Sequence, residues 1–107
     1  MSSYKLDPDA EEELVAAMAW YDAEEEGLGL EFLEEFHSLA QRAARLPNSG
    51  APVEGSPTEA PIRRFLFKRF RHAIYTLVID DTLLVFAVAH QNQKPGYWMK
   101  RLAKVQP

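Results

Sequence analysis

Three runs of apolar and β-branched residues in the second half of the chain alternate with short polar breaks. The runs span Ile62 to Phe70, Ala73 to Ile79 and Leu83 to Ala89, and the breaks are Arg71-His72 and Asp80 to Thr82. Such runs, joined by two or three polar residues, are typical of consecutive antiparallel hairpins. The second and third runs are apolar on both alternate faces, which favours central strands covered on both sides. The pattern therefore predicts a three-stranded antiparallel meander.

The first half of the chain has a helical period instead. After a short strand candidate at Tyr4 to Leu6, Asp7 and Pro8 suit the N-cap and the first helical position. A helix is expected from there to about Glu25 or Glu26. Its apolar stripe has spacings of three and four residues, with two flanking residues widening it. The stripe is Leu14, Ala17, Met18 and Tyr21, and the flanking residues are Val15 and Trp20.

A second helical stripe follows the break at Gly27-Leu28-Gly29 and ends at Pro47. Gly27 suits a left-handed cap, and so short a connection predicts an antiparallel helical hairpin. The apolar positions of this second helix are Phe32, Leu33, Phe36, Leu39, Ala40, Ala43 and Leu46.

The remaining segments are predicted loops and a tail. Residues 47 to 61 have no periodicity and are rich in proline, and residues 91 to 96 form a turn-rich loop before a short turn or helix at Tyr97 to Leu102. The expected order is β-α-α-β-β-β with a short C-terminal tail. This order predicts one α+β domain over residues 1–107, in which the helical hairpin packs on a small antiparallel sheet.

The amino-acid composition indicates the cellular compartment and excludes several kinds of site. The chain has no cysteine, so disulfides and thiolate metal sites are excluded and a reducing cytoplasm is expected. The N-terminus shows no hydrophobic signal region, and the longest apolar run, Leu83 to Ala89, is far shorter than the roughly 18 residues of a membrane helix. His37, His72 and His90 are isolated from one another, so we expect neither a metal site nor a cofactor.

Charge is divided between the two halves of the chain. Residues 1–60 carry fourteen acidic and three basic residues, a net of −11, whereas residues 61–107 carry two acidic and nine basic residues, a net of +7. The two halves either neutralise each other across the fold or form an acidic and a basic side. A basic side would suit a polyanion or an acidic peptide.

Several segments, taken in order, resemble the ParE/RelE superfamily of toxins from type II toxin-antitoxin systems, and within it the ParE-like branch. The resemblance spans nearly the whole chain and rests on order and spacing, since no single segment is diagnostic. The matching segments are Asp9-Ala10-Glu11-Glu12-Glu13-Leu14, Ala19-Trp20-Tyr21, Gly27-Leu28-Gly29 with Glu31-Phe32-Leu33, Ile62-Arg63-Arg64, Lys68-Arg69-Phe70, Ala73-Ile74-Tyr75, Val88-Ala89-His90 and Pro95-Gly96-Tyr97-Trp98.

The resemblance implies a toxin that is neutralised by a cognate antitoxin, whose C-terminal segment wraps around it. Some members of the superfamily poison DNA gyrase, and others cut mRNA on the ribosome without a metal. A third alternative is a degenerate, non-toxic member that only binds its antitoxin. The many glutamates of the helical layer disfavour the ribosome-dependent nuclease, because a protein that settles among phosphates should be basic on both layers.

Two sets of candidate site residues follow. Metal-free RNA cleavage needs a base, a cation and an acid, and His90, Arg69 and Tyr97 could fill these roles if the protein is a nuclease. Antitoxin binding would use a groove with apolar walls and a basic rim, where acidic residues of the antitoxin tail find charge-assisted partners. The residues of this second set are Arg63, Arg64, Lys68, Arg69, Arg71, Trp20 and Tyr21.

Overall fold

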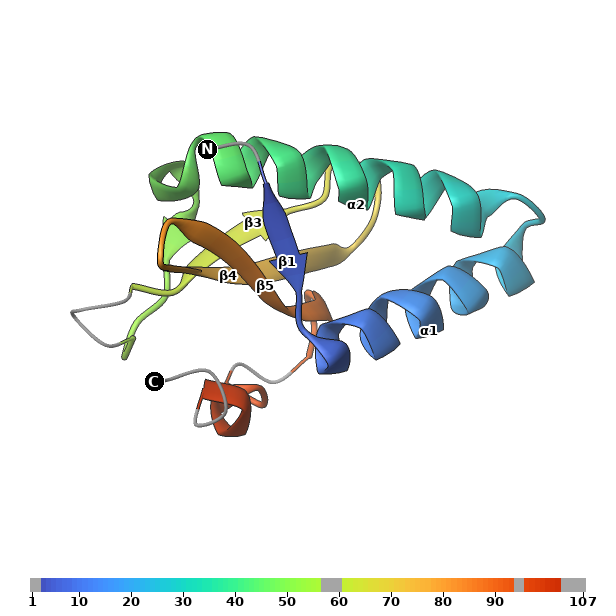
Figure 1. Cartoon of the computed structure of the whole chain (residues 1–107). Coiled ribbons are helices and arrows are strands. Elements are labelled where there is room, and N and C mark those ends of the chain that lie inside the picture. The colour runs from blue at the N-terminus through green and yellow to red at the C-terminus, as the bar shows by residue number, and fades with distance from the viewer. Residues whose placement is uncertain (1–2, 57–60, 94–95, 103–107) are drawn as a thin grey trace.

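Two helices cover one face of a five-stranded sheet (Figure 1). The computed structural model describes residues 3–56, 61–93 and 96–102. The strand order is β1-β5-β4-β3-β2, with β1 (Tyr4–Leu6), β2 (Ala51–Pro52), β3 (Arg63–Leu66), β4 (His72–Ile79) and β5 (Thr82–His90). The helices are α1 (Pro8–Glu24) and α2 (Leu28–Arg45). The predicted α+β arrangement of a helical hairpin on a small sheet is confirmed.

The hairpin is closed by local capping. The side chain of Asp7 accepts a hydrogen bond from the backbone N–H of Asp9 at 3.0 Å, as expected of an N-cap. Gly27 has a φ of 92° and directly precedes α2, so it caps the second helix and not the first. Asp22 Oδ1 accepts from the N–H groups of Gly27 and Gly29 at 3.0 and 3.1 Å. A side chain of α1 therefore satisfies backbone donors at the start of α2.

The central hairpin β4–β5 turns on Asp80 and Asp81, which have φ values of 49° and 63°. Two successive left-handed residues give the type of two-residue turn that matches the twist of the flanking strands. A bulge between Tyr75 and Thr76 shifts the register on the far side of the hairpin. Beyond the bulge His72 lies opposite His90.

The first run of the meander is a shorter strand than predicted. The strand β3 ends at Leu66, and the following segment turns Phe67 and Phe70 into the core against Phe32 of α2. The segment from 47 to 61, predicted as a loop, contains a short 3-10 helix at Pro47–Ser49 and the edge strand β2, which pairs with β3. Residues 57–60 of that segment, and Lys94 and Pro95 of the later loop, lie outside the described residues.

The N-terminal strand makes the sheet mixed. Tyr4 of β1 lies beside Leu83 of β5, and the two strands run parallel. The sheet is therefore antiparallel except at this edge, a feature that the apolar pattern did not indicate.

Apolar side chains form one cluster on each face of the sheet. Leu14, Phe32, Phe36 and Val85 belong to the helix side. On the other face Phe86 and Leu77 pack against Trp98 of the C-terminal tail, which is only 2% exposed. The described part of the tail contains a short 3-10 helix at Met99–Arg101, as predicted. The two central strands are thus covered on both sides.

Three residues assigned to the helical stripes are not in the core. Val15, Trp20 and Leu46 are 59%, 55% and 59% exposed. The stripe of α1 is therefore narrower than predicted, because small residues such as Ala10 and Ala17 let α1 lie close to the sheet without wider side chains. In the described part of the chain, no helix is long and apolar enough to cross a membrane.

Candidate functional site

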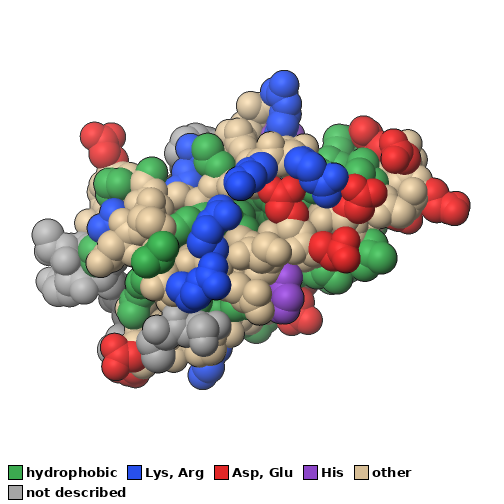
Figure 2. All heavy atoms as spheres, turned by 90° about the horizontal axis from the view of Figure 1, so that it is seen from above, with side chains coloured by type: hydrophobic (Ala, Val, Ile, Leu, Met, Phe, Trp, Pro, Cys, Tyr) green, Lys and Arg blue, Asp and Glu red, His purple; other side chains and the backbone are tan. Residues whose placement is uncertain are grey.

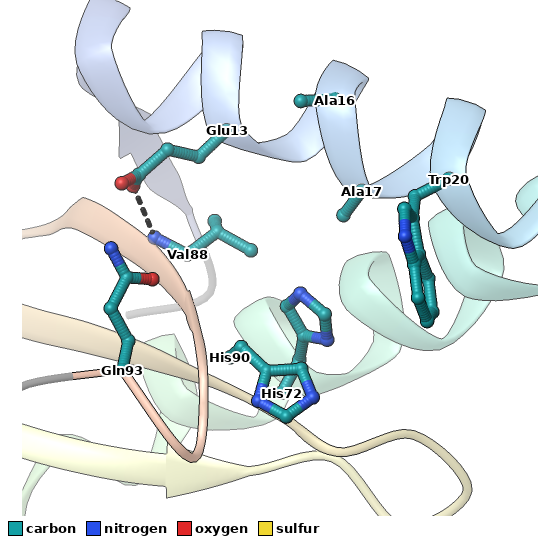
Figure 3. A pocket seen from close by; sticks show the side chains of 8 residues that line it. All are labelled: Glu13, Ala16, Ala17, Trp20, His72, Val88, His90 and Gln93. Atoms are coloured by element: carbon teal, nitrogen blue, oxygen red, sulfur yellow. Dashed lines mark hydrogen bonds between the residues drawn. The ribbon is translucent and has the colours of Figure 1, made fainter.

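A cavity of about 470 Å3 opens between α1 and the end of β5 (Figure 3). Its apolar wall comes from one face of α1 and from Val88 of β5. Two histidines face this wall, and Glu13 closes one end. The lining residues are Glu13, Ala16, Ala17, Trp20, His72, Val88, His90 and Gln93.

The two histidines stand edge to face with their ring centroids 5.2 Å apart. His72 Nδ1 is hydrogen-bonded to the Tyr21 hydroxyl at 2.8 Å, and His90 Nδ1 accepts from the backbone N–H of Asn92 at 3.1 Å. Burial, with a smaller contribution from His90, lowers the pKa of His72 to about 4. His72 is therefore neutral near pH 7.

Glu13 holds four donors at the closed end of the cavity. Its carboxylate accepts from the Tyr97 hydroxyl at 2.6 Å, from two Arg101 nitrogens at 2.9 Å each, and from the backbone N–H of Val88 at 2.9 Å. Burial and the hydrogen bond to Glu13 raise the pKa of the Tyr97 hydroxyl. This hydroxyl stays protonated and tied to a carboxylate.

The three residues proposed for RNA cleavage are engaged separately. Arg69 lies beside α2, with Nη1 at 2.9 Å from Glu31 and Nε at 3.5 Å from Glu35. Tyr97 donates to Glu13, and only His90 lines the cavity. Within the described residues, no hydrogen bond joins any two of these three side chains. The structure does not bring the base, the cation and the acid together.

The proposed basic rim is divided among several places. Arg63 donates to the carbonyl of Gly50 at 3.1 Å, whereas Arg64, the next residue of β3, lines a cavity on the opposite face of the sheet. Lys68 and Arg69 lie against α2, and Arg71 is exposed. Figure 2 shows Lys and Arg side chains in a band across the α2 face, and Asp and Glu gathered toward the turn of the helical hairpin.

Only one of the two predicted aromatic contacts is accessible. Tyr21 is 8% exposed and packs among Phe32, Phe70 and His72 in the core. Trp20 projects from α1 beside the cavity, at the end away from Glu13, and is 55% exposed (Figure 3). Trp20 is therefore the aromatic side chain that a partner can reach.

Sequence reasoning missed Glu13, His72 and Gln93 as members of the site. The position of His72 near His90 could have been predicted from the β4–β5 hairpin. Counting outward from the turn at Asp80 and Asp81 places His72 opposite Ala89, and the bulge moves it by one residue to His90. The hydrogen bond between Glu13 and Tyr97 spans 84 residues of sequence, and no local pattern indicates it.

No model of a known protein family matches this sequence, and no curated protein sequence matches it. Within the described ranges, no three His, Asp or Glu side chains are grouped so that they could hold a metal ion. The cavity offers apolar walls, the neutral imidazole of His72, a second imidazole from His90, the amide of Gln93 and the carboxylate of Glu13. These groups suit an apolar side chain that carries a hydrogen-bonding group.

Proposed function

We propose that this protein is a ParE-like toxin of a type II toxin-antitoxin system. It acts in the cytoplasm by binding an essential target such as DNA gyrase, and a cognate antitoxin neutralises it. The observation that carries the proposal is Trp20, a large aromatic side chain left more than half exposed beside an open apolar cavity. Exposed aromatic side chains next to a pocket are typical anchors of protein–protein interfaces.

The order of the elements supports the same proposal. The resemblance implies a strand, a helical hairpin and an antiparallel meander, and the chain has these elements in that order. The short edge strand β2 is an addition to this order that leaves the arrangement of hairpin and meander unchanged.

The chemistry of the cavity favours binding over RNA cleavage. None of the described residues that line it is a lysine or arginine, and Glu13 contributes a carboxylate to its wall. A pentavalent phosphate needs a cation beside it in the transition state. The described lining offers no such cation, whereas an apolar side chain of a partner would gain by leaving water.

Induced expression in bacteria tests the target. We expect growth arrest with an SOS response and loss of plasmid supercoiling, reversed when the product of a small neighbouring reading frame is co-expressed. Codon-phased cuts in mRNA that disappear in His90→Ala would replace this proposal with the ribosome-dependent nuclease. Normal growth together with tight binding of the neighbouring product would indicate a non-toxic antitoxin-binding protein.

The Trp20→Ala variant tests whether the cavity beside Trp20 is the surface that binds the antitoxin. Because Trp20 is mostly exposed, its removal should change the free energy of unfolding by less than about 0.5 kcal/mol. It should weaken binding of the neighbouring product by about 2 kcal/mol in calorimetry, the range of an interface anchor. Val15→Ala on the same helix, at an equally exposed position, is the matched control. Equal affinities of the two variants would exclude the cavity as the binding surface.

A further inference from the structure

A second cavity, of about 500 Å3, lies on the face of the sheet that the helices leave uncovered. Its floor is formed by β2, β3 and β4, and the C-terminal tail forms a wall. Arg64, Tyr75 and Trp98 supply much of its polar and aromatic surface, and Pro52 and Met99 add apolar surface. None of the residues that line the first cavity, apart from Gln93, takes part in it.

Two residues that line this cavity carry a buried donor with no acceptor among the described residues. Among the described residues, neither Arg64 Nε nor Trp98 Nε1 has a hydrogen-bond partner, and Trp98 is 2% exposed. Both groups can only donate. A buried donor without an acceptor costs free energy, so a ligand that offers acceptors here recovers that cost.

Arg64 differs from two other arginines of the chain in having no acidic partner. Arg69 pairs with Glu31 and Glu35, and Arg101 is held by both oxygens of Glu13. Arg64 makes no ion pair within the described residues, although Glu54 stands elsewhere in the cavity wall. Its neighbours across the sheet are Ala51 on β2 and Tyr75 on β4. Arg64 and its small neighbour Ala51 both line the open cavity.

We propose that this cavity binds a carboxylate of a partner peptide, either an acidic side chain or a chain terminus. Arg64 donates to the carboxylate from its planar guanidinium, and the indole N–H of Trp98 is a second donor. An apolar neighbour in the peptide covers Met99 and the ring of Tyr75. This inference rests on the proposed function, because the peptide is a segment of the antitoxin.

A peptide carboxylate suits this cavity better than an RNA phosphate. Nucleic-acid backbones are bound by several cations, and Arg64 is the one described arginine or lysine in the lining. The two histidines that could move a proton lie with the helix-side core, where His72 contacts Tyr21 and Phe32. Glu54 would repel an extended phosphate chain, whereas a peptide brings backbone N–H groups that can donate to it.

Two-dimensional NMR of the full chain tests the proposal through its donors. The probe is N-acetyl-leucine, which has a carboxylate beside an apolar side chain, and N-acetyl-leucinamide is the uncharged control. We expect N-acetyl-leucine to shift the Trp98 indole N–H and Arg64 Nε–H signals in a saturable manner. The amide should shift neither, and the indole signal of exposed Trp20 is the internal reference.

Two variants distinguish binding at Arg64 from a general effect of the positive charge of the protein. Arg64→Gln should weaken the apparent affinity for N-acetyl-leucine at least about tenfold, the effect of losing a charge-assisted pair. Arg45→Gln, an exposed arginine of α2, should leave it unchanged. If N-acetyl-leucine moves neither donor signal, the proposal is overturned. It is also overturned if adenosine 3′-monophosphate moves both signals and the carboxylate moves neither, since the cavity would then be a phosphate site.

The inference and the proposed function can fail independently. If the neighbouring gene product neutralises a toxic protein and binds Arg64→Gln as tightly as the unaltered chain, the carboxylate site is excluded while the toxin assignment stands. If carboxylates bind but the protein neither harms cells nor binds that product, the toxin assignment is excluded.

Discussion

Burial gives His72 properties that an exposed histidine lacks. Its ring lies 5.4 Å from Tyr21, 5.1 Å from Phe32 and 5.2 Å from His90, measured between ring centroids. Aromatic rings cannot replace the water that a positively charged imidazole needs, so protonation is disfavoured. Glu13 opposes this effect only weakly, and the pKa of His72 is about 4.

This pKa predicts a loss of stability in mild acid. The unfolded chain takes up a proton on His72 near pH 6.5, whereas the folded chain does so only near pH 4. The free energy of unfolding is therefore unaffected by His72 above pH 6.5, and it falls as the pH decreases from 6.5 to 4. We expect urea unfolding to show a decrease of roughly 2 kcal/mol over that interval. His72→Gln should remove this decrease, and His37→Gln at an exposed position should keep it. An NMR titration of His72 with a midpoint near 6.5 would contradict the assignment.

At the scale of elements, the hairpin depends on a close approach of α1 and α2. A Cβ atom at Gly29 would lie 2.5 Å from the carbonyl oxygen of Met18, which is a backbone atom and cannot move aside. Gly29 also donates to Asp22, which fixes the start of α2. The position therefore has no room for a side chain.

Gly29→Ala should accordingly destabilise the protein by about 1–3 kcal/mol through overpacking, measured by urea unfolding. Gly27→Asn is the comparison, because Gly27 has open space around it and asparagine tolerates a positive φ. We expect Gly27→Asn to cost less than about 1 kcal/mol. If Gly27→Asn destabilises the protein more than Gly29→Ala does, the backbone conformation at Gly27, and not the contact between the helices, determines the stability of the hairpin.

The elements whose signals are local were predicted from the sequence. Both helices carry their apolar periods within their own segments, α1 carries its N-cap at Asp7, and the β4–β5 hairpin carries its turn. The pairing of β2 with β3 was not predicted, because Ala51 and Pro52 have no strand pattern and are ordered by a distant neighbour. The end of β3 was misplaced because Phe67 and Phe70 suit a strand as well as a core turn, and only packing against α2 decides between them.

The candidate site was less predictable than the fold. Trp20, His90 and Arg64 were named from the sequence, and the structure places each of them in the wall of a cavity. The two cavities lie on different faces of the sheet, however, and a one-dimensional pattern does not show which face an arginine of a short strand occupies. Glu13 carried no signal, because it stands in a run of glutamates that otherwise face water.

At the scale of the whole molecule, the acidic and basic halves meet across the fold. Arg69 pairs with Glu31 and Glu35, and Arg101 pairs with Glu13 and lies 3.8 Å from Asp9. Each of these pairs joins an arginine of the second half to an acid of the first. The division of charge seen in the sequence is thus partly neutralised inside the molecule, while Arg64, like Arg63 and Arg71, makes no ion pair with another described residue.

The Glu13 network ties the C-terminal tail to α1, which predicts that Tyr97→Phe destabilises the protein. The acceptor of the lost hydrogen bond is a carboxylate, so we expect the free energy of unfolding to fall by about 1–2 kcal/mol. Tyr75→Phe is the control, since no hydrogen bond of the Tyr75 hydroxyl is found among the described residues. In a double-mutant cycle, Tyr97→Phe and Glu13→Gln should be non-additive. Strict additivity would show that the two groups do not interact in solution.

The parallel pairing of β1 with β5 sets the order in which the sheet can be completed. The segment Tyr4–Leu6 has its only strand partner in the described chain at Leu83–Val85, so β1 can pair only after β5 has been synthesised. The β4–β5 hairpin closes over two residues, whereas joining β1 to β5 closes a loop that contains residues 7–81, at a greater cost in chain entropy. During synthesis the nascent protein therefore carries an apolar strand edge at β5 until its own N-terminus returns to cover it.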